Sequence, residues 1–284
     1  MLILSDAASV LRWSLAFRTA GLRIGFVPTM GALHEGHVSL LRTARAECER
    51  VIASIFVNPL QFGPNEDFSA YPRPFERDRA MCEEAGVDLL YRGVTADFYP
   101  PEFRTAVRVS ELTETLCGRS RPGHFDGVCT VVTKLLLRTL PHRAYFGQKD
   151  YQQATVIRRM VADLDIPAEI RVLPTVREPD GLAMSSRNMY LAPAERAAAP
   201  CLYRGLCAAR DLFAAGERTA GTLTGACRRS IDAEPLARTD YVTAADADTL
   251  REFRDEERVV GRAVLAVAVR MGKARLIDNE LLEP

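Results

Sequence analysis

Residues 51–57, Val-Ile-Ala-Ser-Ile-Phe-Val, constrain the fold more than any other stretch of this 284-residue sequence, because they form an almost continuous apolar run. Such a run is typical of a strand that is buried on both faces, as strands of parallel sheets are. An antiparallel sheet with one solvated face would instead alternate apolar and polar residues. The run therefore favours a parallel sheet.

Helical and strand-like patterns alternate through the first half of the chain. Apolar residues at helical spacing predict helices over residues 5–20, 36–49, 75–85, 130–139 and 151–164. Short apolar runs predict strands over residues 23–27, 51–57, 87–91, 144–146 and 170–173. This alternation is typical of βαβ units, which build parallel sheets.

The pattern changes after residue 176. Residues 177–191 are rich in turn formers and have no clear period. Two Ala-rich segments then predict helices over residues 194–215 and 220–233, and strand-like runs follow at 240–243, 262–269 and 274–277. We expect the tail to form a smaller α+β domain.

The charges of the sequence cancel, with 37 Lys plus Arg against 37 Asp plus Glu. Proteins that bind nucleic acid usually carry a basic excess, so we expect no nucleic-acid partner. The start has no basic region before its apolar residues, and no apolar stretch approaches the ~20 residues of a spanning helix. Seven cysteines without a Cys-x-x-Cys pair are typical of reduced thiols. We expect a cytoplasmic protein without a membrane partner.

The first candidate motif, residues 28–37, joins a predicted strand to a predicted helix. Ligands bind at such positions in α/β sheets, and a helix N-terminus favours phosphate. His34 and His37 share one face of the first turn, where two imidazoles could stabilise phosphate charge. Zinc sites of the His-Glu-x-x-His type space their histidines by four, so we expect no metal site. The alternative is a pair of polar residues that cap the helix.

Four further motifs carry polar side chains that suit small substrates. Asn58 and Gln61 follow the buried strand, and their amides could bind hydroxyls or carboxylates, or form an Asn-Pro turn. Residues 119–127 form a basic loop that could bind an anion, contact a second subunit or simply be solvated. Lys149 and Asp150 follow a short strand and could contact phosphate and ribose, or form an ordinary surface pair. Residues 184–188, Met-Ser-Ser-Arg-Asn, could be a phosphate clamp or a linker.

Taken together, these motifs resemble the pantoate–β-alanine ligase family of the nucleotidyltransferase superfamily. The resemblance rests on PTMGALHEGH, FVNPLQF, RPGHFDGV, FGQKDYQQ, MSSRN and RLIDN, which occur in this order along the whole chain. It implies a Rossmann-like parallel sheet domain over residues 1–176 and a smaller α+β C-terminal lid domain over residues 177–284, with the active site between them. It also implies a homodimer.

The family's reaction joins pantoate to β-alanine with ATP, through a pantoyl adenylate, and releases pyrophosphate and AMP. The resemblance implies Mg²⁺ as the counterion of ATP, and His34, His37 and Lys149 as catalytic residues, with His37 as the acid. It implies pantoate binding by Gln61 and Gln153, and β-alanine binding by Gln61 and Asn58. The residues implied in ATP binding are Met30, Gly31, Ala32, Leu33, His34, Glu35, Gly36, His37, Gly147, Gln148, Lys149, Asp150, Val176, Met184, Ser185, Ser186 and Arg187.

Two positions depart from related patterns. Gln148 stands where Glu is also familiar in the family, and Met184 stands where synthetase-type loops carry a lysine. A different nucleotidyltransferase, such as a cytidylyltransferase, would share the ATP motif, but the context of Gln61 and Gln153 speaks against it. A non-catalytic nucleotide-binding module is disfavoured by the intact His34, His37 and Lys149.

Overall fold

The computed structural model describes residues 1–64 and 66–284 and divides them into two compact units. Unit 1 comprises residues 1–110, 121–148 and 153–174, and unit 2 comprises residues 111–120, 149–152 and 175–284. Asn65 lies outside the described residues. The domain boundary after residue 176 stays a prediction.

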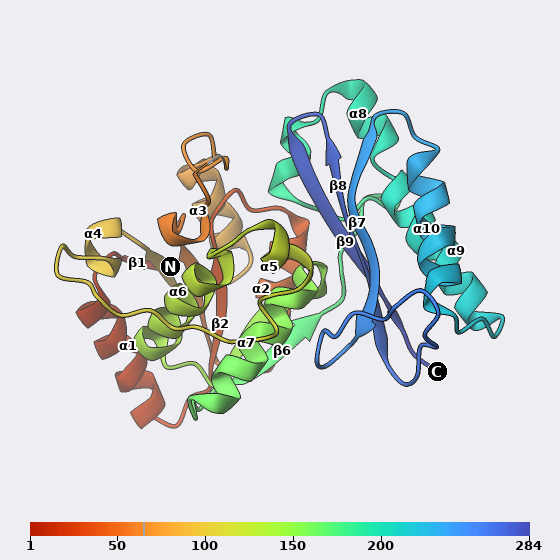
Figure 1. Ribbon diagram of the computed structural model, residues 1–284. Coiled ribbons are helices and arrows are strands. Elements are labelled where there is room, and N and C mark those ends of the chain that lie inside the picture. Colours follow the sequence, from red (N-terminus) through yellow and green to blue (C-terminus); the bar gives the residue numbers. More distant parts are fainter. Residues whose placement is uncertain (65) are drawn as a thin grey trace. The chain divides into compact units, whose positions relative to one another are not determined.

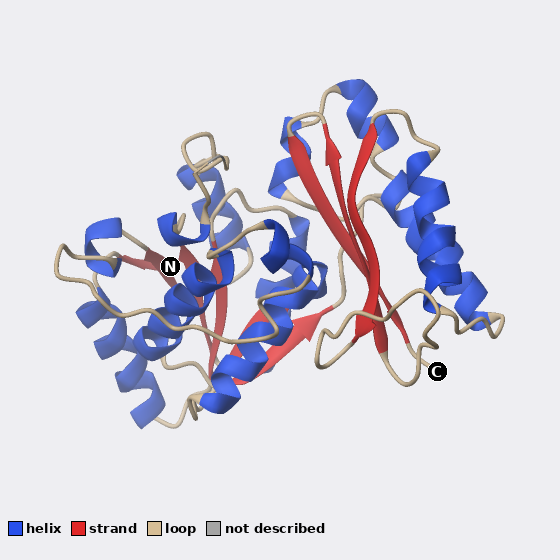
Figure 2. Ribbon diagram, viewed as in Figure 1, coloured by secondary structure: helices blue, strands red, loops and turns tan. Residues whose placement is uncertain are grey.

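Unit 1 is built on a parallel sheet that has six strands in the described part of the chain (Figures 1 and 2). Their order is β1-β4-β3-β2-β5-β6. The strands are β1 (Leu2–Leu4), β2 (Ile24–Thr29), β3 (Arg50–Ile55), β4 (Leu89–Arg92), β5 (Arg143–Gly147) and β6 (Glu169–Leu173). The sequence-based prediction of a parallel sheet is therefore confirmed.

Helices connect these strands. They are α1 (Ala7–Thr19), α2 (Glu35–Glu47), α3 (Phe75–Glu84), α4 (Thr95–Phe98), α6 (His124–Thr139) and α7 (Tyr151–Asp163), with single turns η1 (Pro59–Gln61) and η2 (Gln148–Asp150). Ile24, Phe26 and Val27 of β2 are fully buried, as two-sided coverage requires. Val27 packs in one buried cluster with residues of α2. Helices α1 and α6 also contact β2.

The strand order reverses between β2 and β5. From β2 the chain proceeds through β3 to β4 on one side, and it then returns to place β5 on the other side of β2. Open α/β sheets bind ligands at the carboxyl ends of strands at such a reversal. Pairing between β2 and β5 covers only Gly25 and Phe26, so Pro28, which lacks an N–H, lies beyond it.

Unit 2 contains an antiparallel sheet, three-stranded within the described residues, in the order β7-β8-β9 (Figure 2). Its strands are β7 (Ala237–Asp246), β8 (Ala263–Met271) and β9 (Ala274–Leu282). Its helices are α5 (Leu116–Ser120), α8 (Pro193–Ala198), α9 (Cys201–Ala214) and α10 (Ala220–Asp232), with the turn η3 (Ser186–Tyr190). Leu206, Leu223 and Val267 belong to one buried core formed by α9, α10 and the sheet.

Several predicted boundaries are wrong. Residues 124–127 were expected in a loop, but α6 begins at His124, directly after Gly123, whose φ is +79°. Residues 194–215 were expected to form one helix, but α8 and α9 are separate because Pro200 lacks the N–H that a continuous helix would use. Strand β1 and helix α4 were not expected, since both are too short to show a period.

None of the helices in the described ranges combines the length and the apolar composition of a membrane-crossing span. All seven cysteines lie in these ranges and are free thiols, and six of them are buried.

The close approach of η1 to α6 depends on Gly127. A Cβ atom at this position would lie 2.3 Å from the Leu60 carbonyl oxygen and 2.7 Å from the Gln61 nitrogen. Both atoms belong to the backbone, which cannot move aside as a flexible side chain can. The lack of a side chain at Gly127 thus allows η1, which carries Gln61, to pack against α6.

We expect Gly127→Ala to lower the free energy of unfolding by about 1–3 kcal/mol, the typical cost of overpacking. The same change at Gly225, in α10, meets only the end of the Arg229 side chain at 3.4 Å. Gly225→Ala should therefore raise stability by ~0.5–1 kcal/mol through helix propensity. Urea unfolding of both variants checks the pair, and equal midpoints for Gly127→Ala and the unmodified protein would contradict the packing argument.

Candidate active site

The loop after β2 turns sharply before α2 begins. Gly31 has φ +84° and Ala32 has φ +52°, so two successive residues adopt left-handed backbone. The Thr29 hydroxyl donates to the Ser54 carbonyl at 2.7 Å and accepts the Gly31 N–H at 3.1 Å. These bonds tie the loop to the end of β3.

Asp78 of α3 holds the same loop from the other side. Its two carboxylate oxygens accept the N–H groups of Ala32 at 2.7 Å and Leu33 at 2.8 Å, and the residue is only 1% exposed. Burial raises the pKa of Asp78, and the two backbone bonds oppose this rise. Sequence reasoning missed Asp78, although a carboxylate on the buried face of a predicted helix was a usable signal.

His34 and His37 lie together at the start of α2. His34 is the N-cap, its carbonyl accepts the His37 N–H at 2.8 Å, and the two ring centroids are 4.1 Å apart. Nδ1 of His37 accepts the His34 backbone N–H at 3.3 Å. An accepting nitrogen carries no hydrogen, so the neutral His37 ring bears its proton on Nε2, the atom farther from the backbone. His37 thus offers one N–H donor beside the helix N-terminus.

Gln61 and Asn58 form a buried amide cluster after β3. Gln61 is 8% exposed, and its Nε2 donates to Met30 Sδ at 3.0 Å. Asn58, 1% exposed, donates from Nδ2 to Gln61 Oε1 at 3.0 Å and to the Gly127 carbonyl at 3.1 Å. Its Oδ1 accepts the Tyr99 hydroxyl at 2.7 Å and the Leu60 N–H at 3.3 Å. The structure thus brings the predicted residues Met30, Asn58 and Gln61 into contact.

The basic 119–127 segment supports this cluster. His124 Nδ1 lies 2.8 Å from the Gln61 carbonyl oxygen, to which Arg121 also donates at 3.2 Å. Arg121 forms an ion pair with Glu66 at 2.5 Å. Burial raises the pKa of Glu66, but the hydrogen bond and charge of Arg121 outweigh it and lower the pKa below its usual value. Arg121 and His124 therefore fix the backbone of Gln61.

In unit 2, Lys149 and Asp150 form an ion pair with a separation of 3.5 Å between Nζ and Oδ1. The Lys149 side chain is 19% exposed, and its backbone carbonyl accepts Asn279 Nδ2 at 2.9 Å. Gly147 ends β5 and Gln148 begins η2, both in unit 1, and Gln153 is half-buried in the first turn of α7.

A hairpin in unit 2 carries Val176 and leads to the Met-Ser-Ser-Arg segment. The Val176 carbonyl accepts the Met184 N–H at 3.0 Å, and Arg177 pairs with Ala183. The Ser185 hydroxyl accepts the Arg187 N–H at 3.2 Å and caps η3. The hairpin thus leads directly into η3, which Ser185 caps.

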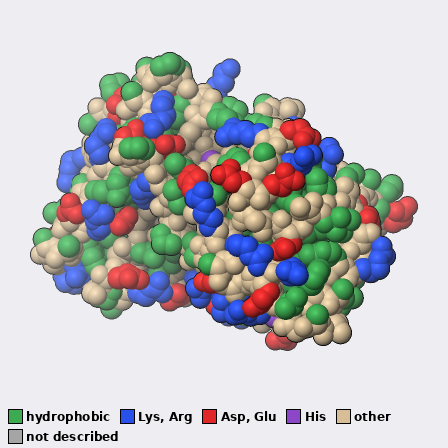
Figure 3. Space-filling view, turned by 180° about the vertical axis from the view of Figure 1, so that it is seen from behind, with side chains coloured by type: hydrophobic (Ala, Val, Ile, Leu, Met, Phe, Trp, Pro, Cys, Tyr) green, Lys and Arg blue, Asp and Glu red, His purple; other side chains and the backbone are tan. Residues whose placement is uncertain are grey.

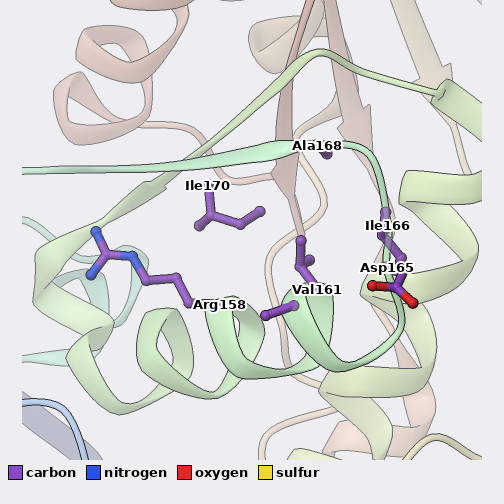
Figure 4. Close-up of a pocket in the computed structure, with 7 residues that line it drawn as sticks. Arg158, Val161, Asp165, Ile166, Ala168 and Ile170 are labelled. Atoms are coloured by element: carbon purple, nitrogen blue, oxygen red, sulfur yellow. The ribbon is translucent and has the colours of Figure 1, made fainter.

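No group of three or more His, Cys, Asp or Glu side chains within residues 1–64 and 66–284 could hold a metal ion. A pocket between α7 and β6, drawn in Figure 4, contains no predicted site residue. It is lined by Arg158, Val161, Ala162, Asp165, Ile166, Ala168 and Ile170. Basic and acidic side chains are interspersed on the face shown in Figure 3, as the zero net charge leads one to expect.

Comparisons with known proteins place this chain among close relatives. The pantothenate synthetase of Moorella thermoacetica is 55% identical over 283 residues, which cover 100% of this chain and 99% of that protein. The relative from Thermotoga neapolitana, also named pantothenate synthetase, is 51% identical over 282 residues, 99% of this chain and 100% of that protein.

Solved structures agree. The pantothenate synthetase of Thermus thermophilus superposes with a TM-score of 0.92 at 48% identity, and 100% of each chain is covered. The pantoate–β-alanine ligase of Francisella tularensis, described as complexed with βγ-ATP and β-alanine, has a TM-score of 0.80 at 35% identity and covers 100% of this chain and 98% of that chain.

The family model described as pantoate–β-alanine ligase matches residues 2–281. This match confirms the resemblance predicted from the six motifs. Because family model, relatives and solved structures agree over nearly the full length, the chain belongs to the pantoate–β-alanine ligase family.

Proposed function

We propose that this protein condenses pantoate with β-alanine at the expense of ATP, giving pantothenate, AMP and pyrophosphate. The observation that carries the proposal is the start of α2, where His34 and His37 lie beside a helix N-terminus at the end of a central strand. Family membership over residues 2–281 supports the choice of substrates.

The chemistry has two steps. A pantoate carboxylate oxygen attacks the α-phosphorus of ATP, the bond from that phosphorus to the bridging oxygen breaks, and pyrophosphate leaves. The β-alanine amine, having lost a proton, then attacks the acyl carbon of the adenylate, and AMP leaves as the acyl C–O bond breaks. Neither step needs a covalent bond to the protein, so catalysis rests on positioning and on charge stabilisation.

Residues 30–37 bind the ATP phosphates in this proposal. The Nε2–H of His37 donates to a phosphate oxygen, and the dipole of α2 adds favourable potential for an anion. His34 stabilises charge on the departing pyrophosphate. Asp78 contributes indirectly, because it holds the loop in the conformation that presents these residues.

Gln61 and Gln153 bind pantoate, and Gln61 also contacts β-alanine. We place Asn58 in the β-alanine site as the residue that orients Gln61. Its own amide is 1% exposed and hydrogen-bonded at both ends, which suits support better than direct contact with substrate. Side-chain amides can hydrogen-bond to carboxylates and hydroxyls without adding charge to the site.

The remaining ATP contacts come from two later segments. Lys149 neutralises phosphate as a compact cation, and Gly147, Gln148 and Asp150 flank it. Val176 contacts adenine through its backbone. Met184, Ser185, Ser186 and Arg187 form the loop that closes on the triphosphate, where the guanidinium provides a planar fork for oxyanions.

Mg²⁺ enters this scheme with ATP. As the counterion of ATP it would be held mainly by phosphate oxygens and water, as Mg²⁺ commonly is. Bound there, it would lower the negative charge of the departing pyrophosphate. We also propose a homodimer, on the family resemblance, and a cytoplasmic location, where seven free thiols stay reduced.

The substrate dependence of AMP release tests the function itself. Purified protein should release AMP and pyrophosphate at a sustained rate only when pantoate, β-alanine and ATP are all present. ADP as the nucleotide product would contradict the adenylate mechanism.

Replacement of His37 tests the phosphate contact. His37→Ala should slow adenylate formation by about 10²–10³-fold, the usual cost of losing one donor at a developing charge. His37→Gln, which keeps a donor and an acceptor, should retain more activity. Single-turnover kinetics check both variants, and unaltered adenylation in His37→Ala would remove this residue from the mechanism.

Removal of the Ser185 and Ser186 hydroxyls tests whether residues 184–187 bind phosphate. Ser185→Ala combined with Ser186→Ala should slow adenylate formation without changing the second step, because pyrophosphate has already left when that step begins. Ser9→Ala, in α1, serves as the control hydroxyl and should have no effect. If the double variant forms adenylate as fast as the unmodified protein, the loop has no role in phosphate binding.

A further inference from the structure

The RLIDN motif, residues 275–279, lies in β9 and has no role in the function proposed above. Successive residues of a strand point to opposite faces of its sheet, so Asp278 and Asn279 serve different faces. Asp278 pairs with Val267, which belongs to the core shared with α9 and α10, whereas Asn279 pairs with Ala266. Both residues are 3% exposed and lie in unit 2.

Asn279 holds the backbone of Lys149. Its Nδ2 donates to the Lys149 carbonyl at 2.9 Å across a sequence distance of 130 residues. The residues beside Lys149 are held to unit 2 as well, because the Tyr151 hydroxyl donates to the Ala247 carbonyl at 2.9 Å. The direction in which the Lys149 side chain leaves the backbone therefore depends on β9.

Asp278 holds the hairpin that precedes residues 184–187. Arg177 donates to both carboxylate oxygens, at 2.6 and 3.1 Å, and to the Gly181 carbonyl at 3.1 Å. The guanidinium carbon also lies 3.9 Å from the centroid of the Tyr203 ring. A bidentate pair of this kind fixes orientation as well as distance. The hairpin that precedes the candidate phosphate-binding residues 184–187 is thus held by the same strand, β9.

We propose that Asn279 and Asp278 are positioning residues for nucleotide binding, with Asn279 acting through Lys149 and Asp278 acting through the hairpin of residues 176–184. The proposal rests on the function proposed above, because Lys149 and the loop receive their roles there. Two neighbouring positions of β9 then fix where Lys149 and the segment of residues 184–187 lie relative to each other within unit 2. Neither positioning residue needs to contact ATP.

A double-mutant cycle with Lys149 tests the role of Asn279. Asn279→Ala should lower kcat/KM for ATP in adenylate formation by about 10-fold, the equivalent of one hydrogen bond. In the Lys149→Ala background the same change should have almost no further effect, because the residue through which Asn279 acts is gone. Asn279→Asp, which keeps the shape but lacks the donor, should behave as Asn279→Ala does.

The control is Thr224→Val, which removes a 2.9 Å bond from a side chain to a backbone carbonyl in α10. It should leave kcat/KM for ATP unchanged, and thermal unfolding of all variants shows whether they stay folded. Multiplicative effects of Asn279→Ala and Lys149→Ala, or full activity of Asn279→Asp, would overturn the role of Asn279. If Lys149→Ala itself forms adenylate at the normal rate, the proposed role of Lys149 fails instead, and the positioning role with it.

A separate variant tests Asp278. Asp278→Asn removes the charge that faces Arg177 and keeps the shape, and we expect a rise in KM for ATP with the KM for β-alanine unchanged. Because this change can destabilise the fold, Arg177→Lys provides a second variant that keeps the charge but loses the bidentate geometry, and it should raise the KM for ATP in the same way. Equal loss for both substrates in these variants would indicate a merely structural role.

Discussion

The burial of β2 and β3 on both faces is the constraint on which unit 1 depends. A strand that is covered on both faces has no solvent-exposed side. The polar residues that follow it therefore lie beyond its end, at the carboxyl edge of the sheet. The two strands pair in parallel from Ile24 with Arg50 to Thr29 with Ile55, and their ends lie level. Residues 30–37 and 58–61 therefore begin at the same edge, and Met30 and Gln61 meet there.

The local geometry beyond that edge is set by groups that do no chemistry. A buried carboxylate, Asp78, accepts two amides of the loop after β2, while Arg121 and His124 bind the carbonyl of Gln61. In unit 2, Asn279 and Asp278 act in the same way on the later segments. The loop after β2, Gln61, Lys149 and the hairpin before residues 184–187 are thus each held by a side chain from a distant part of the sequence. This arrangement holds functional groups within the narrow tolerances that catalysis requires.

Sequence patterns predicted the helices and strands whose apolar patterns extend over many residues. The apolar run at residues 51–57 and the amphipathic periods around it were sufficient for the parallel sheet, and the motif order was sufficient for the family. The break between α8 and α9 at Pro200 and the early start of α6 at His124 were missed, because a period measured over many residues averages across one proline or one glycine. Asp78 and Asn279 were not predicted as supports, since their partners are 45 or more residues away in sequence. Only the folded chain brings them together.

The saturated amide of Asn58 has a consequence for the thermodynamics of substrate binding. Both of its donors and its acceptor are engaged within the protein, and one of them bonds the oxygen of the Gln61 amide. A glutamine side chain that is free in solution loses up to ~2 kcal/mol of rotamer entropy when a ligand immobilises it. In this cluster that loss has already occurred during folding. The Gln61 amide therefore has a preset orientation, and a ligand that bound to it would lose less of its binding enthalpy to ordering of the protein.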